Sequence, residues 1–397
     1  MKLLVLNCGS SSIKYQIIDM ADERALARGL LERVGQPNAR LTHDVFGRST
    51  VMIEQPVNDH AEGLELVLGA ICHRDHGAVD QLDEIYAVGH RVVHGGNRYR
   101  ESVQIDDEVI AALHEFAELA PLHNPANLAG IEACRVALPG VPQVAVFDSA
   151  FHQRLPPSAR EYALPRELIQ QHGLRRYGFH GIAFRWATER AEALLGQSLR
   201  ELKLVTLMLG SGCTANALLF GESVEVSTGF TPLEGLMQST RSGDVDVAMI
   251  LWLMEREGLS PAQMSELLYR RSGWSGRSGL GPDLRETIAA ARNGNREAQL
   301  ALDTFVHRCR KYVGAYAATM GGLHALIFTG GIGEKSPLVR RRICADFEFL
   351  GLRLDEAANE PPGEDRLISA PGSRVRVAVV VMNEELVIAR DTTRLLS

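Results

Sequence analysis

The chain lacks any run of apolar residues that approaches the ~20 needed to span a bilayer as a helix. The short apolar stretch at its beginning ends within residues 9–12, where glycine and serine follow one another, so it does not resemble a secretion signal. We therefore expect a protein of the cytoplasm that neither crosses nor binds a membrane.

Paired cysteines are also missing. The six cysteines are scattered and form no Cys-x-x-Cys pair, which argues against a zinc site and against a disulfide framework. An excess of positive charge is absent too, because the formal net charge is -7. The chain is therefore not expected to bind nucleic acid, and an anionic substrate must meet a local cluster of cations.

What the chain has is enough apolar material for more than one core. Its 397 residues, 45% of them hydrophobic, predict two or more domains. Residues 3–19 read as a hairpin with a small-residue turn, and residues 204–220 repeat this pattern. A second echo links the strands at residues 144–147 and 326–328. Apolar residues at helical spacing predict helices over residues 108–119, 187–195, 246–254, 295–316 and 384–396.

Three turns rich in small residues follow apolar strands, at residues 9–12, 210–212 and 330–333. Glycine lets consecutive backbone N–H groups point inward without a side chain in the way, so such turns can hold phosphates. The alternative is that they are ordinary turns between strands and helices. Their recurrence after apolar strands favours phosphate binding.

Several charged residues stand in unusual surroundings. Arg91 lies in an apolar strand that ends in glycines, and Arg241 lies in a polar turn; either one alone could be a solvated surface group. Together, two guanidinium groups could hold a carboxylate and a phosphoryl group. Asp148 follows a strand and is either a ligand-facing acid or a turn carboxylate. Glu384 is either a Mg²⁺ ligand or a glutamate favoured at a helix start.

An ordered set of segments makes the whole chain resemble the acetate kinase family. They include Gly89-His90-Arg91-Val92-Val93-His94-Gly95-Gly96, Ala120-Pro121-Leu122-His123-Asn124-Pro125, Val146-Phe147-Asp148-Ser149, Arg176-Tyr177-Gly178-Phe179-His180-Gly181, Thr240-Arg241-Ser242-Gly243-Asp244, Phe328-Thr329-Gly330-Gly331-Ile332-Gly333-Glu334 and Asn383-Glu384-Glu385.

This resemblance implies an α/β fold of two duplicated actin-like (ribonuclease H-like) domains that flank a nucleotide cleft. The implied domains are residues 1–150 and residues 151–385, with a C-terminal helix over residues 386–397 that returns to the first domain. The resemblance also implies a homodimer.

The implied reaction is reversible, Mg²⁺-dependent phosphoryl transfer between ATP and acetate, which gives acetyl phosphate and ADP by direct in-line transfer. Mn²⁺ is the alternative ion. By resemblance, the catalytic residues are Arg91, Asp148, His180 and Arg241, and the metal ligands are Asn7 and Glu384.

The resemblance also assigns binding residues. The acetate pocket would be formed by Arg91, Val93, Leu122, Phe179 and Pro232. The nucleotide contacts would be Lys14, Met208, Leu209, Gly210, Ser211, Gly212, Asp283, Leu284, Arg285, Gly331, Ile332, Gly333, Glu334 and Lys335.

The phosphate turn departs from the family. The usual His-Leu-Gly-Asn-Gly appears as Met208-Leu209-Gly210-Ser211-Gly212, and the family's Gly-Thr-Ser-His after His180 appears as Gly181-Ile182-Ala183-Phe184. Three alternatives therefore stay open: a kinase for propionate or another short-chain acid, a pyrophosphate-dependent acetate kinase, and a non-catalytic nucleotide-binding regulator. Val93 favours acetate, because relatives that prefer propionate tend to carry a smaller residue there.

Overall fold

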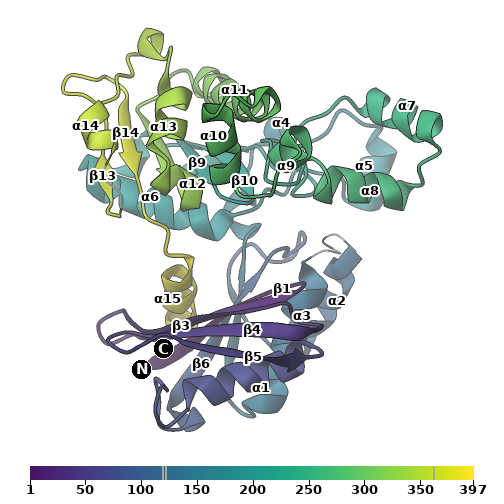
Figure 1. Cartoon of the computed structure of the whole chain (residues 1–397), viewed down its shortest axis with the longest axis vertical. Coiled ribbons are helices and arrows are strands. Elements are labelled where there is room, and N and C mark those ends of the chain that lie inside the picture. The colour runs from purple at the N-terminus through teal and green to yellow at the C-terminus, as the bar shows by residue number, and fades with distance from the viewer. Residues whose placement is uncertain (119, 121–122, 361–362) are drawn as a thin grey trace. The chain divides into compact units, whose positions relative to one another are not determined.

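A computed structural model describes residues 1–118, 120, 123–360 and 363–397 of the chain. Within these residues the chain forms two compact units. The first unit contains Met1–Gln153 and Asn383–Ser397, and the second contains Arg154–Met382 (Figure 1). The end of the chain therefore belongs to the same unit as its beginning.

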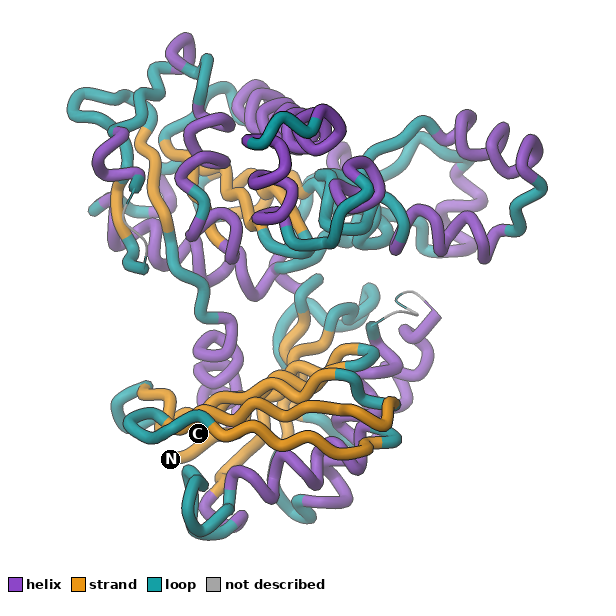
Figure 2. Tube along the Cα trace, viewed as in Figure 1, coloured by secondary structure: helices purple, strands orange, loops and turns teal. Residues whose placement is uncertain are grey.

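The first unit is built on an eight-stranded sheet, orange in Figure 2, with the order β5-β4-β3-β2-β1-β6-β8-β7. Strands β1, β6 and β8 run parallel, and all other neighbours run antiparallel. The strands are β1 Lys2–Gly9, β2 Ser12–Asp19, β3 Arg24–Glu32, β4 Gln36–Val45, β5 Val51–Val57, β6 Ile85–Val92, β7 Val103–Gln104 and β8 Gln143–Phe147.

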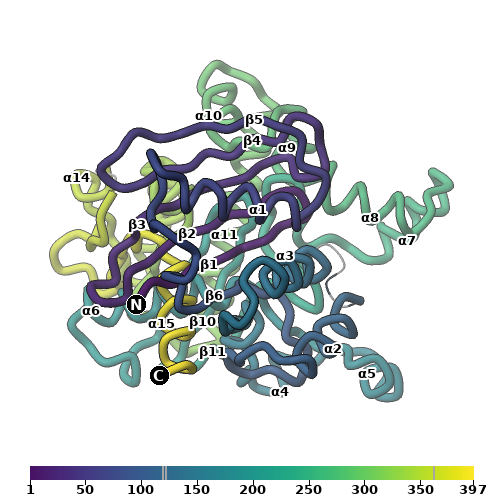
Figure 3. The backbone as a smooth tube through the Cα atoms, turned by 90° about the horizontal axis from the view of Figure 1, so that it is seen from below, coloured from purple at the N-terminus to yellow at the C-terminus, as the bar shows by residue number. Residues whose placement is uncertain are grey.

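Helices cover both faces of this sheet. On one face α1 and α3 pack side by side, as Figure 3 shows, and Gly63 of α1 lies against Ile13 and Leu31. On the other face α15 packs so closely on β6 that a Cβ at Gly89 would lie 2.6 Å from Ile388. The helices are α1 His60–Ile71, α2 Asp107–Glu115, α3 Asn124–Ala137 and α15 Glu384–Leu396, with 3-10 turns η1 Leu82–Glu84, η2 Phe116–Glu118 and η3 Ala150–His152.

The second unit is built on a six-stranded sheet with the order β11-β10-β9-β12-β14-β13. Here β9, β12 and β14 are the parallel strands, and the other neighbours are antiparallel. The strands are β9 Lys203–Leu209, β10 Cys213–Leu219, β11 Glu222–Val226, β12 Ala325–Thr329, β13 Arg366–Leu367 and β14 Arg376–Val379.

The core of the second unit lies between its sheet and the long helix α11, whose Phe305, Cys309 and Val313 are fully buried. Helix α6 packs against β9, β12 and β14. The helices are α4 Pro157–Arg160, α5 Arg166–His172, α6 Gly181–Leu195, α7 Val247–Glu257, α8 Pro261–Arg270, α9 Gly273–Ser278, α10 Leu284–Arg292, α11 Arg296–Thr319, α12 Gly330–Lys335, α13 Pro337–Cys344 and α14 Glu356–Asn359, with 3-10 turns η4 Leu199–Glu201 and η5 Glu348–Leu350.

The two sheets share one topology. The order β3-β2-β1-β6-β8-β7 in the first unit matches β11-β10-β9-β12-β14-β13 in the second, with the same parallel and antiparallel pairings. The predicted fold class of duplicated α/β domains is thereby confirmed, as is the repeated hairpin. The second predicted echo was wrong in its partners, because β8 corresponds to β14 and β12 corresponds to β6. Fully buried strands share an apolar pattern, so the pattern alone did not identify the counterpart.

The predicted helices are present, with shifted ends. The structure extends the predictions at residues 187–195 and 295–316 into α6 and α11, and α15 has the predicted bounds. The helix predicted at residues 108–119 runs from Asp107 to Glu115 and continues as η2; residue 119 lies outside the described residues. In the part of the chain that the structure describes, no helix is long and apolar enough to cross a membrane.

Candidate active site

The carboxyl ends of the parallel strands in the first unit bring four predicted site residues together. Asn7 near the end of β1 pairs in register with Lys14 of β2, and Arg91 lies on the neighbouring strand β6. Asp148 follows β8, and its backbone N–H donates to the Val92 carbonyl over 2.9 Å. In sheets of this kind, ligands bind beyond the carboxyl ends of the strands.

A buried ion pair lies at the centre of this group. Arg91 Nη2 donates to Asp148 Oδ2 over 2.6 Å, and Arg91 Nη1 donates to Asn7 Oδ1 over 3.4 Å. The Asp148 side chain is 1% exposed. Burial alone would lower the pKa of Arg91, but the carboxylates of Asp148 and Glu384 outweigh it and raise the pKa. The guanidinium therefore stays charged and oriented.

Helix α15 adds two more carboxylates to the group. Its first two residues are Glu384 and Glu385, and Glu385 forms an ion pair with Lys14. Burial raises the pKa of Glu384, while Arg91 opposes this shift. The first unit therefore concentrates acidic and basic side chains at one edge of its sheet.

The oxygens of this group suit a hard cation. Among the described residues, Asp148 Oδ1 is a buried atom without a hydrogen-bond partner. The Asn7 amide oxygen and the Glu384 carboxylate belong to the same group of side chains around Arg91. Mg²⁺ prefers such oxygen ligands and usually takes one or two carboxylates together with phosphates and water. The residues therefore fit the predicted ion.

The segment after β6 carries Val93, one of the predicted acetate contacts. Val93 is 6% exposed, and its backbone N–H donates to Asn127 Oδ1 over 3.1 Å. The Asn124 side chain holds the next residue, because its Oδ1 accepts the His94 N–H and its Nδ2 donates to the His94 carbonyl. Sequence reasoning missed both asparagines, which lie on buried positions of α3. Leu122, the other predicted contact in this unit, lies outside the described residues.

In the second unit, His180 lies beside the phosphate turn. It adopts a left-handed conformation (φ +60°) at the start of α6, and its Nδ1 lies 2.9 Å from Thr214 Oγ1. A Cβ at Gly212 would lie 3.0 Å from His180 Cε1 and 3.5 Å from Gln238 Oε1. A side chain at this position would therefore press against the His180 ring, in addition to affecting any backbone contact with phosphate.

Arg241 lies in the loop that follows. Its guanidinium is 5.6 Å from the ring centroid of Tyr269, and its carbonyl accepts the backbone N–H of Gln238 over 3.1 Å. Burial lowers the pKa of Arg241, and Tyr269 partly opposes this. Gln238, for which the sequence predicted no role, thus lies between Gly212 with the neighbouring His180 and the backbone of Arg241.

The predicted acetate contacts of this unit, Phe179 and Pro232, are both buried. The Phe179 N–H donates to Thr228 Oγ1 over 3.0 Å. Arg176 holds the loop between them, because Nη2 donates to Glu234 Oε1 over 2.6 Å and Nη1 donates to the carbonyls of three consecutive residues. These are Val226, Ser227 and Thr228, at 3.1, 3.3 and 3.1 Å.

This partly buried ion pair was also missed. Glu234 accepts a second hydrogen bond from the Tyr162 hydroxyl over 2.5 Å, and that hydroxyl in turn accepts the Phe230 N–H over 2.8 Å. Burial and the bond to Glu234 raise the pKa of Tyr162. Arg176 lay in a motif of the family resemblance, but only its neighbours Phe179 and His180 were assigned roles.

The third small-residue turn forms the start of α12. Gly330 has φ +76°, and a Cβ there would lie 2.7 Å from the Leu209 carbonyl oxygen, so this glycine packs directly on β9. Nothing lies within 4 Å of a Cβ at Gly331. Glu334 points back and accepts the Met382 N–H over 3.1 Å, and buried Arg340 donates to the carbonyls of Gly333 and Glu334 over 2.8 Å.

The remaining predicted nucleotide residues differ in what they can offer. The Leu209 and Leu284 side chains lie in the hydrophobic core, so only their backbone is available. Asp283 caps α10 through the Arg285 N–H, and its ion pair with Arg285 lowers its pKa. Arg285 is 91% exposed. Ser211 is exposed, and Met208 is half-buried.

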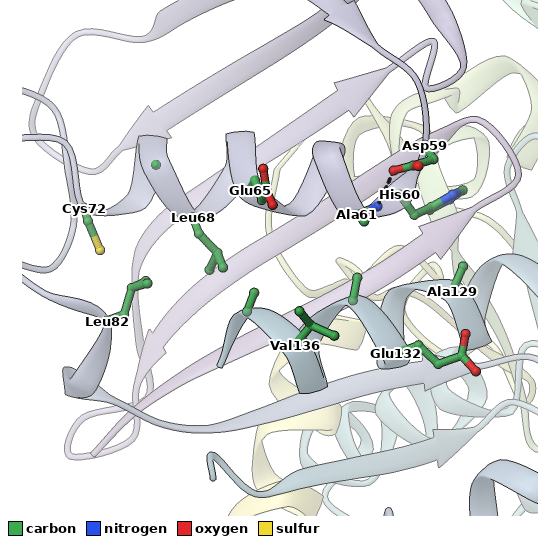
Figure 4. Close-up of a pocket in the computed structure, with 13 residues that line it drawn as sticks. Asp59, His60, Ala61, Glu65, Leu68, Cys72, Leu82, Ala129, Glu132 and Val136 are labelled. Atoms are coloured by element: carbon green, nitrogen blue, oxygen red, sulfur yellow. Dashed lines mark hydrogen bonds between the residues drawn. The ribbon is translucent and has the colours of Figure 1, made fainter. Parts of the chain in front are cut away.

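A groove between α1 and α3 has a volume of about 840 Å³. Figure 4 shows Leu68 of α1 and Val136 of α3 pointing into it. Its charged lining includes the acidic residues Asp59, Glu65 and Glu132, and none of the predicted site residues contributes. The groove is therefore not part of the candidate active site.

Known proteins resemble this chain over its whole length. The model of the Acetokinase family matches residues 2–390. The chain is 48% identical over 396 residues to the acetate kinase of Alkaliphilus metalliredigens, with 100% of both chains covered. The crystal structure of Porphyromonas gingivalis acetate kinase has a TM-score of 0.95 at 45% identity and covers 100% of both chains. A propionate kinase from Francisella tularensis has a TM-score of 0.92 at 36% identity and covers 99% of both chains.

Proposed function

This chain belongs to the acetokinase family, and we propose that it transfers a phosphoryl group directly between ATP and acetate with the side chains described above. Family membership makes it a phosphotransferase with a carboxyl group as acceptor and with ATP and ADP as the nucleotide pair. The observation that carries the proposed roles is the buried Arg91–Asp148 pair at the strand ends of the first unit.

In the proposed reaction a carboxylate oxygen of acetate attacks the γ-phosphorus of ATP. A bond forms between this oxygen and phosphorus, the bond from phosphorus to the β,γ-bridging oxygen breaks, and ADP leaves with the electron pair. Acetate is already ionised at neutral pH, so no general base is needed. Asp148 therefore acts by orienting Arg91 rather than by taking a proton. Charge on the transferred group is stabilised by Arg91, Arg241 and His180, as phosphoryl transfer requires.

Asn7 and Glu384 would hold Mg²⁺. When bound, this ion neutralises charge on the nucleotide phosphates. Within the described residues, no group of three or more His, Cys, Asp or Glu side chains is arranged to hold a metal. We infer that phosphate oxygens and water complete the ligand set, which is how Mg²⁺ is usually bound in kinases.

Acetate is the proposed acceptor because the described acetate contacts are bulky and buried. Val93 is 6% exposed and Phe179 is 1% exposed. One extra methylene against apolar side chains changes discrimination by only ~1–3 kcal/mol. Propionate should therefore be a poorer substrate that is still turned over.

The test is hydroxamate formation from acetate in magnesium buffer, with ATP and then pyrophosphate as donor. Activity with ATP that is lost in Arg241→Ala and kept in Arg154→Ala supports the proposal. Arg154 is a matched control, because it is 80% exposed and pairs with Glu222 at the surface of the same unit. Activity with pyrophosphate alone would favour the pyrophosphate-dependent alternative. Saturable ATP binding without turnover would favour the regulator.

A homodimer is the proposed assembly. Helix α7 has no buried residue. Its large apolar side chains Val247, Leu251 and Trp252 are 71, 63 and 60% exposed. Its last residues carry both acidic and basic side chains, so two copies can pair without repulsion between like charges. Light scattering should show that Trp252→Glu produces monomers, whereas Val136→Glu, at a position 83% exposed on α3, should stay dimeric. A dimer in both variants would contradict this interface.

A cytoplasmic location remains a prediction from the sequence.

A further inference from the structure

We propose that Gln238 is a positioning residue, which fixes the spacing between the acetate contact at Pro232 and the phosphate turn at Gly212. This inference rests on the proposed function, since it concerns how the same acid is held. Within the second unit, Gln238 hydrogen-bonds Pro232 and lies close to Gly212, and it has no role in the reaction described above.

The two ends of the Gln238 side chain face different parts of the site. Its Nε2 donates to the Pro232 carbonyl over 2.8 Å. Its Oε1 lies 3.5 Å from the position of a Cβ at Gly212, a position that is also 3.2 Å from His180 Nε2. The amide thus lies between Pro232, a proposed acetate contact, and the turn at Gly212, which lies beside His180.

The backbone of Gln238 is fixed independently of its side chain. Its N–H donates to the Arg241 carbonyl over 3.1 Å, and its carbonyl accepts the Trp274 N–H over 3.1 Å. The next residue, Ser239, donates its N–H to the Ser211 carbonyl over 3.0 Å. The side chain is 1% exposed. A buried side chain on a fixed backbone has little freedom, so its length sets the distance between the groups that it touches.

The Gln238 amide should affect acetate binding through its hydrogen bond to the Pro232 carbonyl. Pro232 has no N–H to anchor its loop, so the loop depends on bonds to its carbonyl groups at this point. Loss of the Gln238 bond frees the Pro232 carbonyl while the Arg176–Glu234 pair still holds the rest of the loop. The pocket should then widen locally, which weakens acetate binding and admits propionate more readily.

The experiment compares Gln238→Met with Gln299→Met. Methionine has nearly the same length as glutamine but no amide, and Gln299 is an exposed control on α11 in the same unit, where it bonds Asp303. Acetate and ATP dissociation constants are measured by tryptophan fluorescence, which needs no turnover. The ratio of kcat/KM for acetate over propionate is measured by hydroxamate formation.

For Gln238→Met we expect acetate binding about tenfold weaker, as for loss of one buried hydrogen bond, and a several-fold smaller acetate preference. ATP affinity should stay within about twofold, because backbone bonds hold the phosphate turn separately. Unchanged acetate affinity with only a lower unfolding temperature would overturn the proposal, as would an equal loss of ATP and acetate affinity.

Gln238→Asn is the second variant, because it keeps the amide but is one methylene too short to reach both groups. Loss of the fold in both variants would make Gln238 a structural residue and overturn the proposal. A wild-type protein that binds acetate without phosphorylating it would defeat the proposed function, while the comparison of acetate affinities would still decide the role of Gln238.

Discussion

The two units use one sheet topology for different chemistry. Each residue at the strand ends of the first unit has a counterpart at the equivalent register position in the second unit. All four counterparts of the charged or amide side chains in the first unit are neutral. The pairs are Asn7 with Met208, Lys14 with Thr214, Arg91 with Thr329 and Asp148 with Met382.

The difference shows how a duplicated fold can divide a phosphoryl transfer. In the first unit, side-chain charges crowd around Arg91 at the strand ends. In the second unit, the equivalent positions carry backbone and neutral donors instead of charges, such as Thr214 beside His180 and the glycines after β12. Fixed backbone donors suit a polyphosphate, whereas a transferred phosphoryl group requires charge. We therefore propose that the strand ends of the first unit supply charge to the transferred group, and that those of the second unit supply neutral nucleotide contacts.

The largest effect should follow from removing the charge. Arg91→Ala should lower kcat about 10²–10³-fold, as for loss of one preorganised electrostatic donor, while ATP affinity changes little. It also leaves Asp148 buried without its partner, which costs about 3–5 kcal/mol of unfolding free energy. Steady-state kinetics, ATP titration and denaturant unfolding measure the three quantities.

The control for this prediction is Arg91→Lys, which keeps the charge but loses the planar set of donors. It should recover most of the stability and little of the activity, because lysine does not replace arginine at a site that binds several oxygens. Equal loss of ATP affinity and kcat in Arg91→Ala would mean that the units do not divide the reaction as described.

A second difference between the units predicts their response to acid. His90 is 2% exposed and bonds Gln143, whereas its counterpart in the second unit is the apolar Phe328. Burial lowers the pKa of His90 to about 4. The unfolded chain therefore binds a proton that the folded chain does not, between the ordinary histidine pKa of about 6.5 and pH 4. Stability from this residue is present above pH 6.5 and is lost as the pH falls, by about 3 kcal/mol at pH 4.

Urea unfolding at pH 7 and pH 4.5 tests this sign. His90→Gln keeps a polar group near Gln143 but cannot titrate, so it should lose less stability between the two pH values than the wild type. The variant must be compared with itself at both pH values, since the substitution also changes packing. An identical loss in the wild type and the variant would show that other groups control the acid response.

Sequence reasoning found the strands, the repeated hairpin and the residues of the charged group, because periodic apolar patterns and ordered motifs carry those features. It could not find Gln238, Asn124 or Asn127. The two asparagines act on backbone groups far along the chain, for example Asn127 on Cys8 at a separation of 119 residues. Gln238 bonds the Pro232 carbonyl only six residues away, but it meets Gly212 only in the folded chain. Local patterns contain no trace of such contacts until the fold is known.

The correction of the second echo has a related cause. Strands β6, β8, β12 and β14 are buried on both faces and read as similar apolar runs, so only their order in the sheet identifies counterparts. Conversely, Leu209 and Leu284 were predicted as nucleotide contacts from motif membership, yet their side chains lie in the core. A motif identifies a segment, and the fold decides which face of it meets the ligand.

A smaller effect should come from the backbone side of the comparison. Gly330→Ala places a Cβ 2.7 Å from the Leu209 carbonyl oxygen at a residue with φ +76°. Strain of this kind costs about 1–3 kcal/mol, and displacement of the turn should weaken ATP binding with acetate binding unchanged. Thermal unfolding and ATP titration measure both. Gly331→Ala meets nothing within 4 Å, so its unfolding temperature should match the wild type; equal destabilisation of the two variants would exclude this steric cause.

The smallest effect should come from Met208, where the second unit has a neutral side chain at the position of Asn7 and where the family usually has histidine. Met208 is half-buried, opposite Thr214 in the hairpin, so Met208→His should fold with a change of no more than about 0.5 kcal/mol. An added donor beside the phosphate turn should lower KM for ATP a few-fold, and kcat with acetate should change less. Met208→Gln, a neutral donor of similar length, separates charge from hydrogen bonding. Improved ATP binding in both variants would show that neutral donors in the second unit bind ATP. Improved binding in the histidine variant alone would show that charge in the second unit also contributes to ATP binding.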